Sequence, residues 1–532
     1  MHQPKIAGHA ISWASAQHGN RPAVIIHDRT YSFTEVERRS NQLANALTGL
    51  GLRPGDRLAT LLGNCIESLD SVFGAEKAAQ TYVALNARHT LAEHVDILND
   101  AEATTLIVGP EFTGLACAMR ARVPSLRHII GVKVADGDVL DYDALLEGAS
   151  DRFPALPIAP ELLVRIAYTS GTTGKPKGVA YSVERWYTRL TNHFYAMEFE
   201  LGVEDAMLHV GPLTHAAGVY LLPCYLRGAR NVIAEKFDAA QVIALVERHR
   251  VTQLMLVPTM LKRLLEELDA GAAADLSSLR RIHYGTAPTP LDTVKRAITR
   301  FGPILRQQYG MTEVVQPLSV LYPHDHVVDG PADETARTLS CGRPTINVDI
   351  AIHDADGKPV ATGEVGEIAV AHWGIGEVAF WRRPDLEEQS IRNGWYYTGD
   401  LGKFDDAGYL YIVGRNKDMI ISGGFNVYSR EVEDALCRHP SVLDAAVVGI
   451  PDREWGELVA AFVVLRPGQT LTADAFGQYC GELIAGYKKP RVTEFVDELP
   501  RNGSGKVLKN ELRASYMARH GITQEGITAV YS

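Results

Sequence analysis

Residues 168–178 read Tyr168-Thr169-Ser170-Gly171-Thr172-Thr173-Gly174-Lys175-Pro176-Lys177-Gly178, and they follow directly on an apolar run, residues 162–167. The run predicts a buried strand, and the glycines after it predict a loop in which the backbone can approach a ligand closely. Consecutive N–H groups, hydroxyls and lysines in such a loop can surround phosphate oxygens. The spacing differs from the common phosphate loop G-x-x-x-x-G-K-S/T. The alternative, a flexible surface loop, would not need hydroxyls, lysines and glycines at once.

Strand and helix patterns alternate on both sides of this loop. Towards the N-terminus, Thr34 followed by Glu37 predicts a capping box that opens a helix. Towards the C-terminus, residues 252–257 and 281–284 predict strands, and residues 260–268 predict a helix between them. This alternation predicts an α/β fold in which largely parallel sheets are covered by helices.

The pattern changes in the last third of the chain. Residues 347–413 contain short alternating runs between Gly-, Asp- and Pro-rich turns, which predicts a smaller β-rich lobe. A charged break at residues 414–418 is followed by a compact α+β pattern. We therefore expect a large N-terminal domain of layered sheets, residues 1–414, a hinge at residues 415–418, and a small C-terminal domain, residues 419–532.

Composition limits the classes of function. The 532-residue chain is 46% hydrophobic and has a formal net charge of -11. An acidic chain is not expected to bind nucleic acid, because phosphate contacts need a basic surface. The six cysteines form no C-x-x-C pair and predict reduced thiols, as in the cytosol. Neither a signal peptide nor a run of about 20 apolar residues is present, so we expect a cytoplasmic protein without a membrane span.

Further motifs follow the loop in order along the chain. They are Tyr309-Gly310-Met311-Thr312-Glu313, Tyr397-Thr398-Gly399-Asp400, Gly414-Arg415-Asn416-Lys417-Asp418 with Gly423-Gly424-Phe425-Asn426, Tyr487-Lys488-Lys489-Pro490, and Pro500-Arg501-Asn502-Gly503-Ser504-Gly505-Lys506. Together with residues 168–178, they resemble the motifs of the adenylate-forming superfamily, which contains acyl- and aryl-CoA synthetases, nonribosomal peptide adenylation domains and beetle luciferases. The resemblance extends from about residue 20 to about residue 515.

The resemblance implies a two-step ligase reaction. A small-molecule carboxylic acid and ATP give an acyl-AMP and pyrophosphate, and the acyl group then passes to coenzyme A with release of AMP. Mg²⁺ is the expected metal cofactor, and a homodimer is an assembly that the sequence leaves open. Two alternatives remain: transfer of the acyl group to a carrier-protein thiol or an amine, and a nucleotide-binding protein that has lost catalysis.

The resemblance also assigns the nucleotide site. Glu313 would hold Mg²⁺ between phosphates, Thr312 would bond the α-phosphate, and Asp400 would accept hydrogen bonds from the ribose hydroxyls. The nucleotide-binding residues would be Thr169, Ser170, Gly171, Thr172, Thr173, Gly174, Lys175, Lys177, Gly285, Thr286, Ala287, Pro288, Tyr309, Gly310, Met311, Thr312, Asp400, Arg415 and Lys506. Taken alone, Glu313 could be a solvated acid and Asp400 a turn residue.

Lys506 and His215 are the remaining catalytic candidates, beside Thr312 and Glu313. The ammonium of Lys506 would bridge the attacking carboxylate and the α-phosphate, since these two anions repel one another. His215 would line the acid pocket, although a packed core histidine would have the same sequence pattern. The acid pocket would contain His215, Ala216, Ala217, Gly285, Gln308, Gly310 and Met311. Small side chains there favour a bulky, aromatic or polycyclic acid.

The two half-reactions need different surroundings, and the resemblance supplies a hinge. Rotation about Lys417 would make the small C-terminal domain mobile and exchange the face that carries Lys506 for another. Gly423, Gly424 and Phe425 would then line the channel for coenzyme A, because glycine lets a narrow chain pass close to the backbone. A simple hairpin turn would also explain Gly423-Gly424, and both interpretations can hold together.

Overall fold

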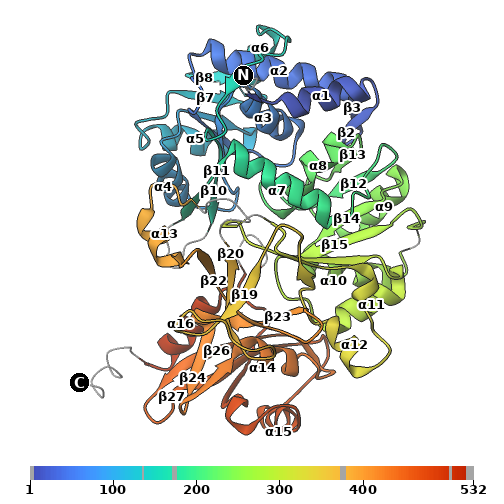
Figure 1. Ribbon diagram of the computed structural model, residues 1–532, viewed down its shortest axis with the longest axis vertical. Coiled ribbons are helices and arrows are strands. Elements are labelled where there is room, and N and C mark those ends of the chain that lie inside the picture. The colour runs from blue at the N-terminus through green and yellow to red at the C-terminus, as the bar shows by residue number, and fades with distance from the viewer. Residues whose placement is uncertain are drawn as a thin grey trace.

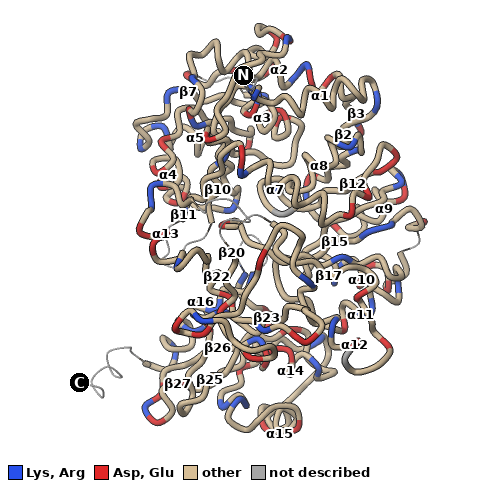
Figure 2. The backbone as a smooth tube through the Cα atoms, in the orientation of Figure 1, with Lys and Arg blue, Asp and Glu red and all other residues tan. Residues whose placement is uncertain are grey.

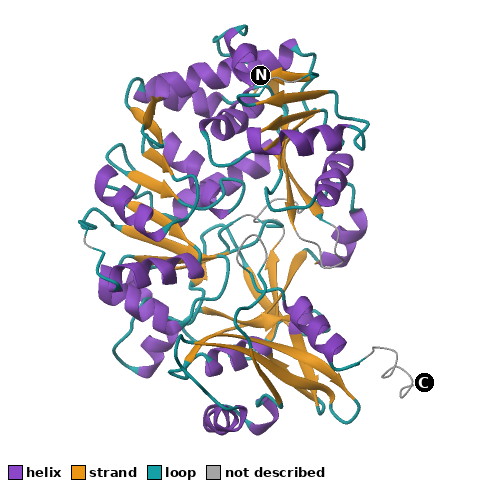
Figure 3. Ribbon diagram, turned by 180° about the vertical axis from the view of Figure 1, so that it is seen from behind, coloured by secondary structure: helices purple, strands orange, loops and turns teal. Residues whose placement is uncertain are grey.

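The computed structural model describes residues 5–134, 137–169, 176–272, 274–314, 316–371, 379–501 and 506–522. Two large sheets form the upper part of the molecule in Figure 1, a β-rich lobe lies below them, and the C-terminal sheet lies at the bottom. Seen from behind, the strands run through the interior and most helices lie outside them (Figure 3). The predicted α/β class with a smaller C-terminal unit is confirmed.

The first sheet has seven strands and carries the strand that leads into the glycine-rich loop. Its strands are parallel except for β11, which pairs antiparallel with β10. In spatial order they are β11 Lys177–Ser182, β10 Leu163–Thr169, β5 Thr81–Ala84, β4 Arg57–Leu61, β6 Thr105–Val108, β7 His128–Gly131 and β8 Val139–Asp141. The short strands β1 (Lys5–Ile6) and β9 (Pro157–Ile158) form a separate pair.

The second sheet has nine strands, of which the six central ones are parallel. In spatial order the nine are β18 Arg343–Pro344, β17 Ser319–Leu321, β16 Leu305–Tyr309, β15 Arg281–Gly285, β14 Gln253–Leu256, β12 Ala206–His209, β13 Arg230–Ile233, β2 Pro22–Ile26 and β3 Arg29–Ser32. Because parallel strands present their C-terminal ends at one edge, β15 and β16 place the residues that follow them side by side.

Helices cover both faces of these sheets, as the apolar contacts show. One face of the first sheet packs on α4 and α5 and the other on α2, α3 and α6. The second sheet packs on α9, α10 and α11. The helices are α1 His9–His18, α2 Phe33–Gly49, α3 Ile66–Lys77, α4 Leu91–Ala101, α5 Thr113–Arg120, α6 Tyr142–Glu147, α7 Val183–Ala196, α8 Leu221–Leu226, α9 Ala239–His249, α10 Pro258–Asp269, α11 Leu291–Phe301, α12 Ala332–Arg337, α13 Pro384–Ser390, α14 Ser429–Leu436, α15 Ala473–Leu483 and α16 Lys509–Arg519.

The β-rich lobe and the C-terminal unit each have a five-stranded sheet of their own. The lobe contains β19 Ile350–His353, β20 Gly366–Ala371, β21 Ile391–Arg392, β22 Trp395–Phe404 and β23 Leu410–Arg415. The C-terminal sheet contains β24 Met419–Ser422, β25 Phe425–Tyr428, β26 Val442–Asp452, β27 Gly456–Leu465 and β28 Val492–Phe495, with α14 and α15 on one face and α16 on the other. One 3-10 turn, η5 (Asn416–Asp418), joins β23 to β24.

The predicted capping box of α2 is wrong by two residues. Ser32, not Thr34, accepts the N–H of Glu35, and the Glu35 carboxylate accepts the N–H of Ser32. Glu37 instead accepts a hydrogen bond from the buried ammonium of Lys77 at 2.6 Å, which ties α2 to α3. Both Ser/Thr-x-x-Glu pairs satisfy the sequence rule, and the contact with Lys77 decides between them.

Candidate active site

The glycine-rich loop and the Thr312-Glu313 motif meet at the end of β10. The hydroxyl of Thr169, the last residue of that strand, lies 3.4 Å from Oε1 of Glu313, to which it donates. Lys177 begins β11 and pairs with Thr169 in the β10–β11 register. The predicted loop residues Ser170, Gly171, Thr172, Thr173, Gly174 and Lys175 lie outside the described residues. The residue that leads into the loop therefore contacts the predicted metal-side carboxylate, and the strand that follows the loop starts directly opposite that residue.

Two residues that the sequence motifs did not indicate hold the Thr312-Glu313 backbone. The Tyr181 hydroxyl donates to the Thr312 carbonyl, and the guanidinium of Arg185 donates to the Glu313 carbonyl. Arg185 is buried and also donates to the Ala180 carbonyl at 2.7 Å. An arginine in the first turn of α7 is disfavoured by the helix dipole, and this was the sequence signal for a tertiary role.

Asp400 lies at the junction of the second sheet and the β-rich lobe. Its Oδ2 accepts a hydrogen bond from the Tyr309 hydroxyl at 2.7 Å, and its Oδ1 lies 3.0 Å from Nε of Arg415. Burial and the neighbouring carboxylate raise the pKa of Tyr309 well above its usual value, so the phenol remains a donor. Asp400 and Arg415 are also direct partners in the β22–β23 register. The structure thus brings together three predicted nucleotide-site residues.

Gly285 and Thr286 end β15 beside β16. A Cβ at Gly285 would lie 2.3 Å from the Gln308 carbonyl oxygen, so this close approach of two strands admits only glycine. Thr286 has a φ of 70°, a conformation that costs a β-branched residue about 1–3 kcal/mol. Ala287 and Pro288 continue from this strained residue. Such strain is maintained only where the surroundings fix the backbone, and here it shapes the predicted nucleotide wall.

The predicted acid-pocket residues come from two elements. His215 precedes the 3-10 helix η2 (Ala216–Tyr220), and Gln308 lies on β16, followed by Gly310 and Met311. The Tyr220 hydroxyl donates to Oε1 of Gln308 at 2.8 Å, which joins the two elements. Ala217 is buried, and its carbonyl accepts from Nδ1 of the buried His209 at 2.8 Å. The side chain of Ala216 lies outside the description.

Lys506 belongs to the C-terminal unit and lies within electrostatic reach of the residues around Asp400. Its side chain is exposed to solvent, although nearby protein atoms remove part of the water around the ammonium. This partial loss of solvation and then the positive charge of Arg415 lower the pKa of Lys506 to about 8, while Asp400 opposes the shift. The charges of Asp400 and Arg415 therefore reach the predicted catalytic lysine, although these residues lie about one hundred positions away along the chain.

The Gly423-Gly424 pair forms a tight hairpin between β24 and β25. The φ angles are 58° and 81°, as a two-residue hairpin turn requires. A Cβ at Gly423 would lie 2.8 Å from the Trp455 ring, whereas no atom of the described residues lies within 4 Å of one at Gly424. The next residue, Phe425, is exposed and stacks on Tyr487 at 4.7 Å. Lys417, the predicted hinge residue, lies exposed within η5.

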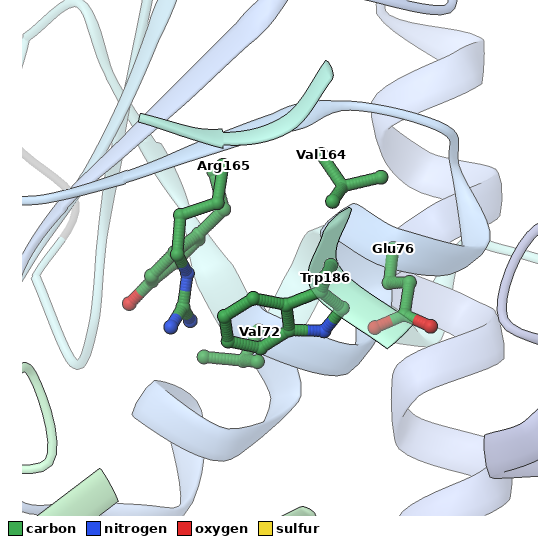
Figure 4. Close-up of a pocket in the computed structure, with 6 residues that line it drawn as sticks. Val72, Glu76, Val164, Arg165 and Trp186 are labelled. Atoms are coloured by element: carbon green, nitrogen blue, oxygen red, sulfur yellow. The ribbon is translucent and has the colours of Figure 1, made fainter. Parts of the chain in front are cut away.

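A small cavity lies between α3, β10 and α7 (Figure 4). The Arg165 guanidinium lies over the Trp186 ring at 4.4 Å and over the Tyr82 ring at 5.1 Å. On another wall, Glu76 accepts a hydrogen bond from Tyr187 at 2.9 Å. The volume of about 10 Å³ suits one water molecule and is too small for any substrate. These contacts hold α7, and with it Arg185, against the first sheet.

Fold and site together define an adenylate-forming enzyme. Residues 11–377 match the family described as AMP-binding enzyme, and residues 431–506 match its C-terminal domain. The chain belongs to the AMP-binding enzyme family, and it is an ATP-dependent acid–thiol ligase of the acyl-CoA synthetase type.

Two relatives and one solved structure each match almost the whole length of this chain. The chain is 34% identical to a medium/long-chain-fatty-acid–CoA ligase, FadD8, of Mycobacterium tuberculosis, covering 97% of this chain and 91% of the relative. It is 36% identical to a feruloyl-CoA synthase of an Amycolatopsis species, covering 91% and 94%. The amide bond synthetase McbA from Marinactinospora thermotolerans superposes with a TM-score of 0.85 at 29% identity, covering 96% of this chain and all of that one.

Proposed function

We propose that the described site joins a bulky or aromatic carboxylic acid to coenzyme A, with Lys506, Glu313, Thr312 and Asp400 in the roles given below. The observation that carries the proposal is the contact of Asp400 with Tyr309 and Arg415, a cluster whose charges also reach Lys506 of the C-terminal unit. A lysine of the C-terminal unit at the nucleotide side of the molecule is the arrangement that the first half-reaction needs. The same chain also offers a second face, the Gly423-Gly424 hairpin, for the second half-reaction.

In the first half-reaction, a carboxylate oxygen of the acid attacks the α-phosphorus of ATP, and pyrophosphate leaves. Both reactants are anions, so the ammonium of Lys506 would lie between them and offset their repulsion. Thr312 would donate its hydroxyl to the α-phosphate. Asp400, whose carboxylate is already oriented by Tyr309 and Arg415, would accept hydrogen bonds from the ribose hydroxyls. The hydrogen bonds of Tyr181 and Arg185 to backbone carbonyls would keep Thr312 and Glu313 in position.

Glu313 fits a Mg²⁺ ion that is held mainly by phosphates. In the described parts of the chain, no three His, Cys, Asp or Glu side chains gather in a way that could hold a metal ion. Among the described residues, Thr169 donates a long hydrogen bond to one carboxylate oxygen of Glu313, and a carboxylate has further lone pairs that could bind a cation. One carboxylate with phosphate oxygens and waters is the usual magnesium arrangement in such sites. When bound, the ion would neutralise charge that develops on the leaving pyrophosphate.

In the second half-reaction, the thiol sulfur of coenzyme A attacks the acyl carbon, and AMP leaves. Rotation about Lys417 would withdraw Lys506 and bring the Gly423-Gly424 hairpin to the acyl carbonyl. Its two glycines carry no side chains, so a narrow chain could pass close to this backbone. Alternation of the two faces would separate the half-reactions, so that each could be lost without the other.

The acid is proposed to be bulky or aromatic. Ala217, Gly285 and Gly310 lack large side chains, and a fuller residue at Gly285 is excluded by the Gln308 carbonyl. Relatives are described as acting on ferulate and on medium- and long-chain fatty acids. The test is pyrophosphate release with acetate, octanoate, benzoate, cinnamate and ferulate. Higher kcat/KM for acetate than for every aromatic acid would contradict the proposal.

The acceptor needs its own experiment, because the amide bond synthetase has the same fold. Products formed from one acid with coenzyme A, with a holo carrier protein and with an amine would be compared at equal concentrations. We expect the thioester of coenzyme A to form fastest.

We also propose a cytoplasmic location, because all six cysteines are free thiols. Every helix in the described ranges is too short or too polar to cross a bilayer, and charges of both signs are interspersed along the chain (Figure 2).

A further inference from the structure

His215 contacts the loop that follows β5, far away in the sequence. Nδ2 of Asn86 lies 3.1 Å from Nε2 of His215. Asn86 belongs to the connection between β5 and α4, in the first large sheet, whereas His215 introduces η2 beside the second sheet. The contact therefore joins the two halves of the N-terminal part at a residue that the proposed function places in the acid pocket.

The orientation of the Asn86 amide is fixed by its other end. Oδ1 accepts the backbone N–H of Arg88 at 3.0 Å, and only the oxygen of an amide can accept. Nδ2 must therefore be the atom that faces His215. The backbone carbonyl of Asn86 accepts the N–H of His89 at 2.9 Å, so the whole residue is held in a turn.

An amide NH₂ group donates and cannot accept, so Nε2 of His215 has to offer its lone pair. The ring proton then resides on Nδ1, and the imidazole is neutral. The titratable side chains near enough to influence the ring in the described structure are His89 and Arg88, from the same loop as Asn86. Burial lowers the pKa of His215 most, a hydrogen bond with the Thr214 backbone opposes this shift, and the nearby His89 and Arg88 side chains lower the pKa further.

We propose that Asn86 is a positioning residue that holds His215 as the neutral Nδ1–H tautomer during adenylation. The proposal rests on the proposed function, in which His215 faces the acid. A cationic ring there would pair with the substrate carboxylate and lower its nucleophilicity towards the α-phosphorus. A neutral ring fixed from behind leaves the carboxylate reactive and keeps the pocket wall in one orientation.

The test replaces Asn86 with a residue of the same shape and opposite hydrogen-bonding sense. In Asn86→Asp, the carboxylate accepts from Nε2, which favours the other tautomer and the imidazolium. An opposite charge at this distance raises a histidine pKa by about 1–3 units. We expect the acidic limb of kcat/KM for pyrophosphate release to move up by about one to two pH units. Asn86→Ala should move it less in the same direction, because it only removes the donor that favours the neutral ring.

The matched control is Asn99→Asp on α4. Asn99 is an exposed asparagine whose Nδ2 donates to the Arg122 carbonyl at 3.1 Å, so its replacement makes the same change of charge without touching His215. Its pH profile should coincide with that of the unchanged enzyme. If Asn86→Asp lowers the melting temperature but leaves the acidic limb in place, Asn86 is only structural and the proposal is overturned.

The protonated nitrogen of the His215 ring can also be observed directly in the unchanged enzyme, which does not depend on how well the Asn86 variants fold. Ring ¹H–¹⁵N correlations of the unchanged enzyme, with His215 assigned through His215→Gln, report which nitrogen carries the proton. A proton on Nδ1 supports the proposal, and a proton on Nε2 overturns it. If His215→Gln itself leaves adenylation unchanged, the assigned role of His215 in the acid pocket fails, whereas the tautomer result still tests the contact with Asn86.

Discussion

The Tyr309 hydroxyl donates a 2.7 Å hydrogen bond to Asp400, which links the last residue of β16 to the middle of β22. The Tyr309 side chain thereby connects the second sheet to the β-rich lobe. The carboxylate that is proposed to receive the ribose is oriented before the nucleotide arrives. Asp400 is also held by Arg415 at 3.0 Å, so removal of either partner leaves the other in place.

Tyr309→Phe should therefore raise the KM for ATP while it changes kcat less. A hydrogen bond to a charged group contributes about 1.5–3 kcal/mol, which corresponds to roughly a ten- to hundred-fold loss of affinity. The measurement is ATP–pyrophosphate exchange at varied ATP. An unchanged KM for ATP would show that Asp400 does not need Tyr309 to bind the ribose.

Lys506→Ala should abolish adenylation and spare thioester formation from supplied acyl-AMP. Loss of a preorganised charge at the transition state costs roughly 100- to 1,000-fold. The substitution should slow only the half-reaction that takes place while Lys506 is near Asp400. Equal losses in both half-reactions would contradict the alternation of two faces.

The pH dependence follows from the lowered pKa of Lys506. The ammonium is the active form, so kcat/KM for the first half-reaction should fall as pH rises through about 8. Bound phosphates favour the cation, so the limb of kcat should lie at higher pH. Lys506→Arg is the control: its side chain stays charged, and the alkaline limb should disappear even if the rate is lower. A limb that persists in this variant belongs to another group.

Glu313→Gln should raise the Mg²⁺ concentration needed for half-maximal adenylation. The amide preserves the shape and the contact with Thr169 but removes the negative charge that faces the cation. The measurement is a Mg²⁺ titration of pyrophosphate release at fixed ATP. The same titration curve for both enzymes would remove Glu313 from the metal side of the site.

Gly424→Leu should block thioester formation and leave ATP–pyrophosphate exchange nearly intact. In the part of the chain that the structure describes, no atom lies within 4 Å of a Cβ built at this residue, so we expect the side chain to obstruct only the arriving coenzyme A. The φ of 81° strains every L residue there, and asparagine least. Gly424→Asn and Gly424→Ala thus separate strain from obstruction. Full thioester activity in the leucine variant would mean that the acceptor arrives elsewhere.

The fold class could be predicted from the sequence because the pattern that identifies a helix or a strand lies within the element itself. Residues 252–257 and 260–268 gave β14 and α10 within two residues at each end, since apolar spacing is set by the element itself. The capping box failed because Thr34-Glu37 and Ser32-Glu35 satisfy the same rule. Only Lys77, forty residues further along, shows that Glu37 is needed elsewhere.

The sequence could indicate candidate site residues only where they lie in contiguous motifs. Asp400, Glu313 and Lys506 all stand in such motifs. Asn86 and Arg185 do not, because each acts through a contact with a residue more than one hundred positions away. A single sequence does not show which residue lies at the other end of such a contact, even where, as for Arg185 in the first turn of α7, the position of the side chain indicates a tertiary role. The roles of the predicted residues, the domain boundaries and the hinge remain predictions for the experiments above.

The connection between β23 and β24 consists of a single turn, η5, of three residues. If the proposed roles hold, such a short tether would keep Lys506 at an effective concentration of the order of millimolar or higher near the nucleotide. In the proposed alternation, the C-terminal unit would need no affinity of its own for the rest of the molecule, and a weak interface would let it exchange between the two arrangements. A chain cut within η5 would turn this intramolecular encounter into a bimolecular one. Adenylation would then depend on the concentration of the separate C-terminal fragment.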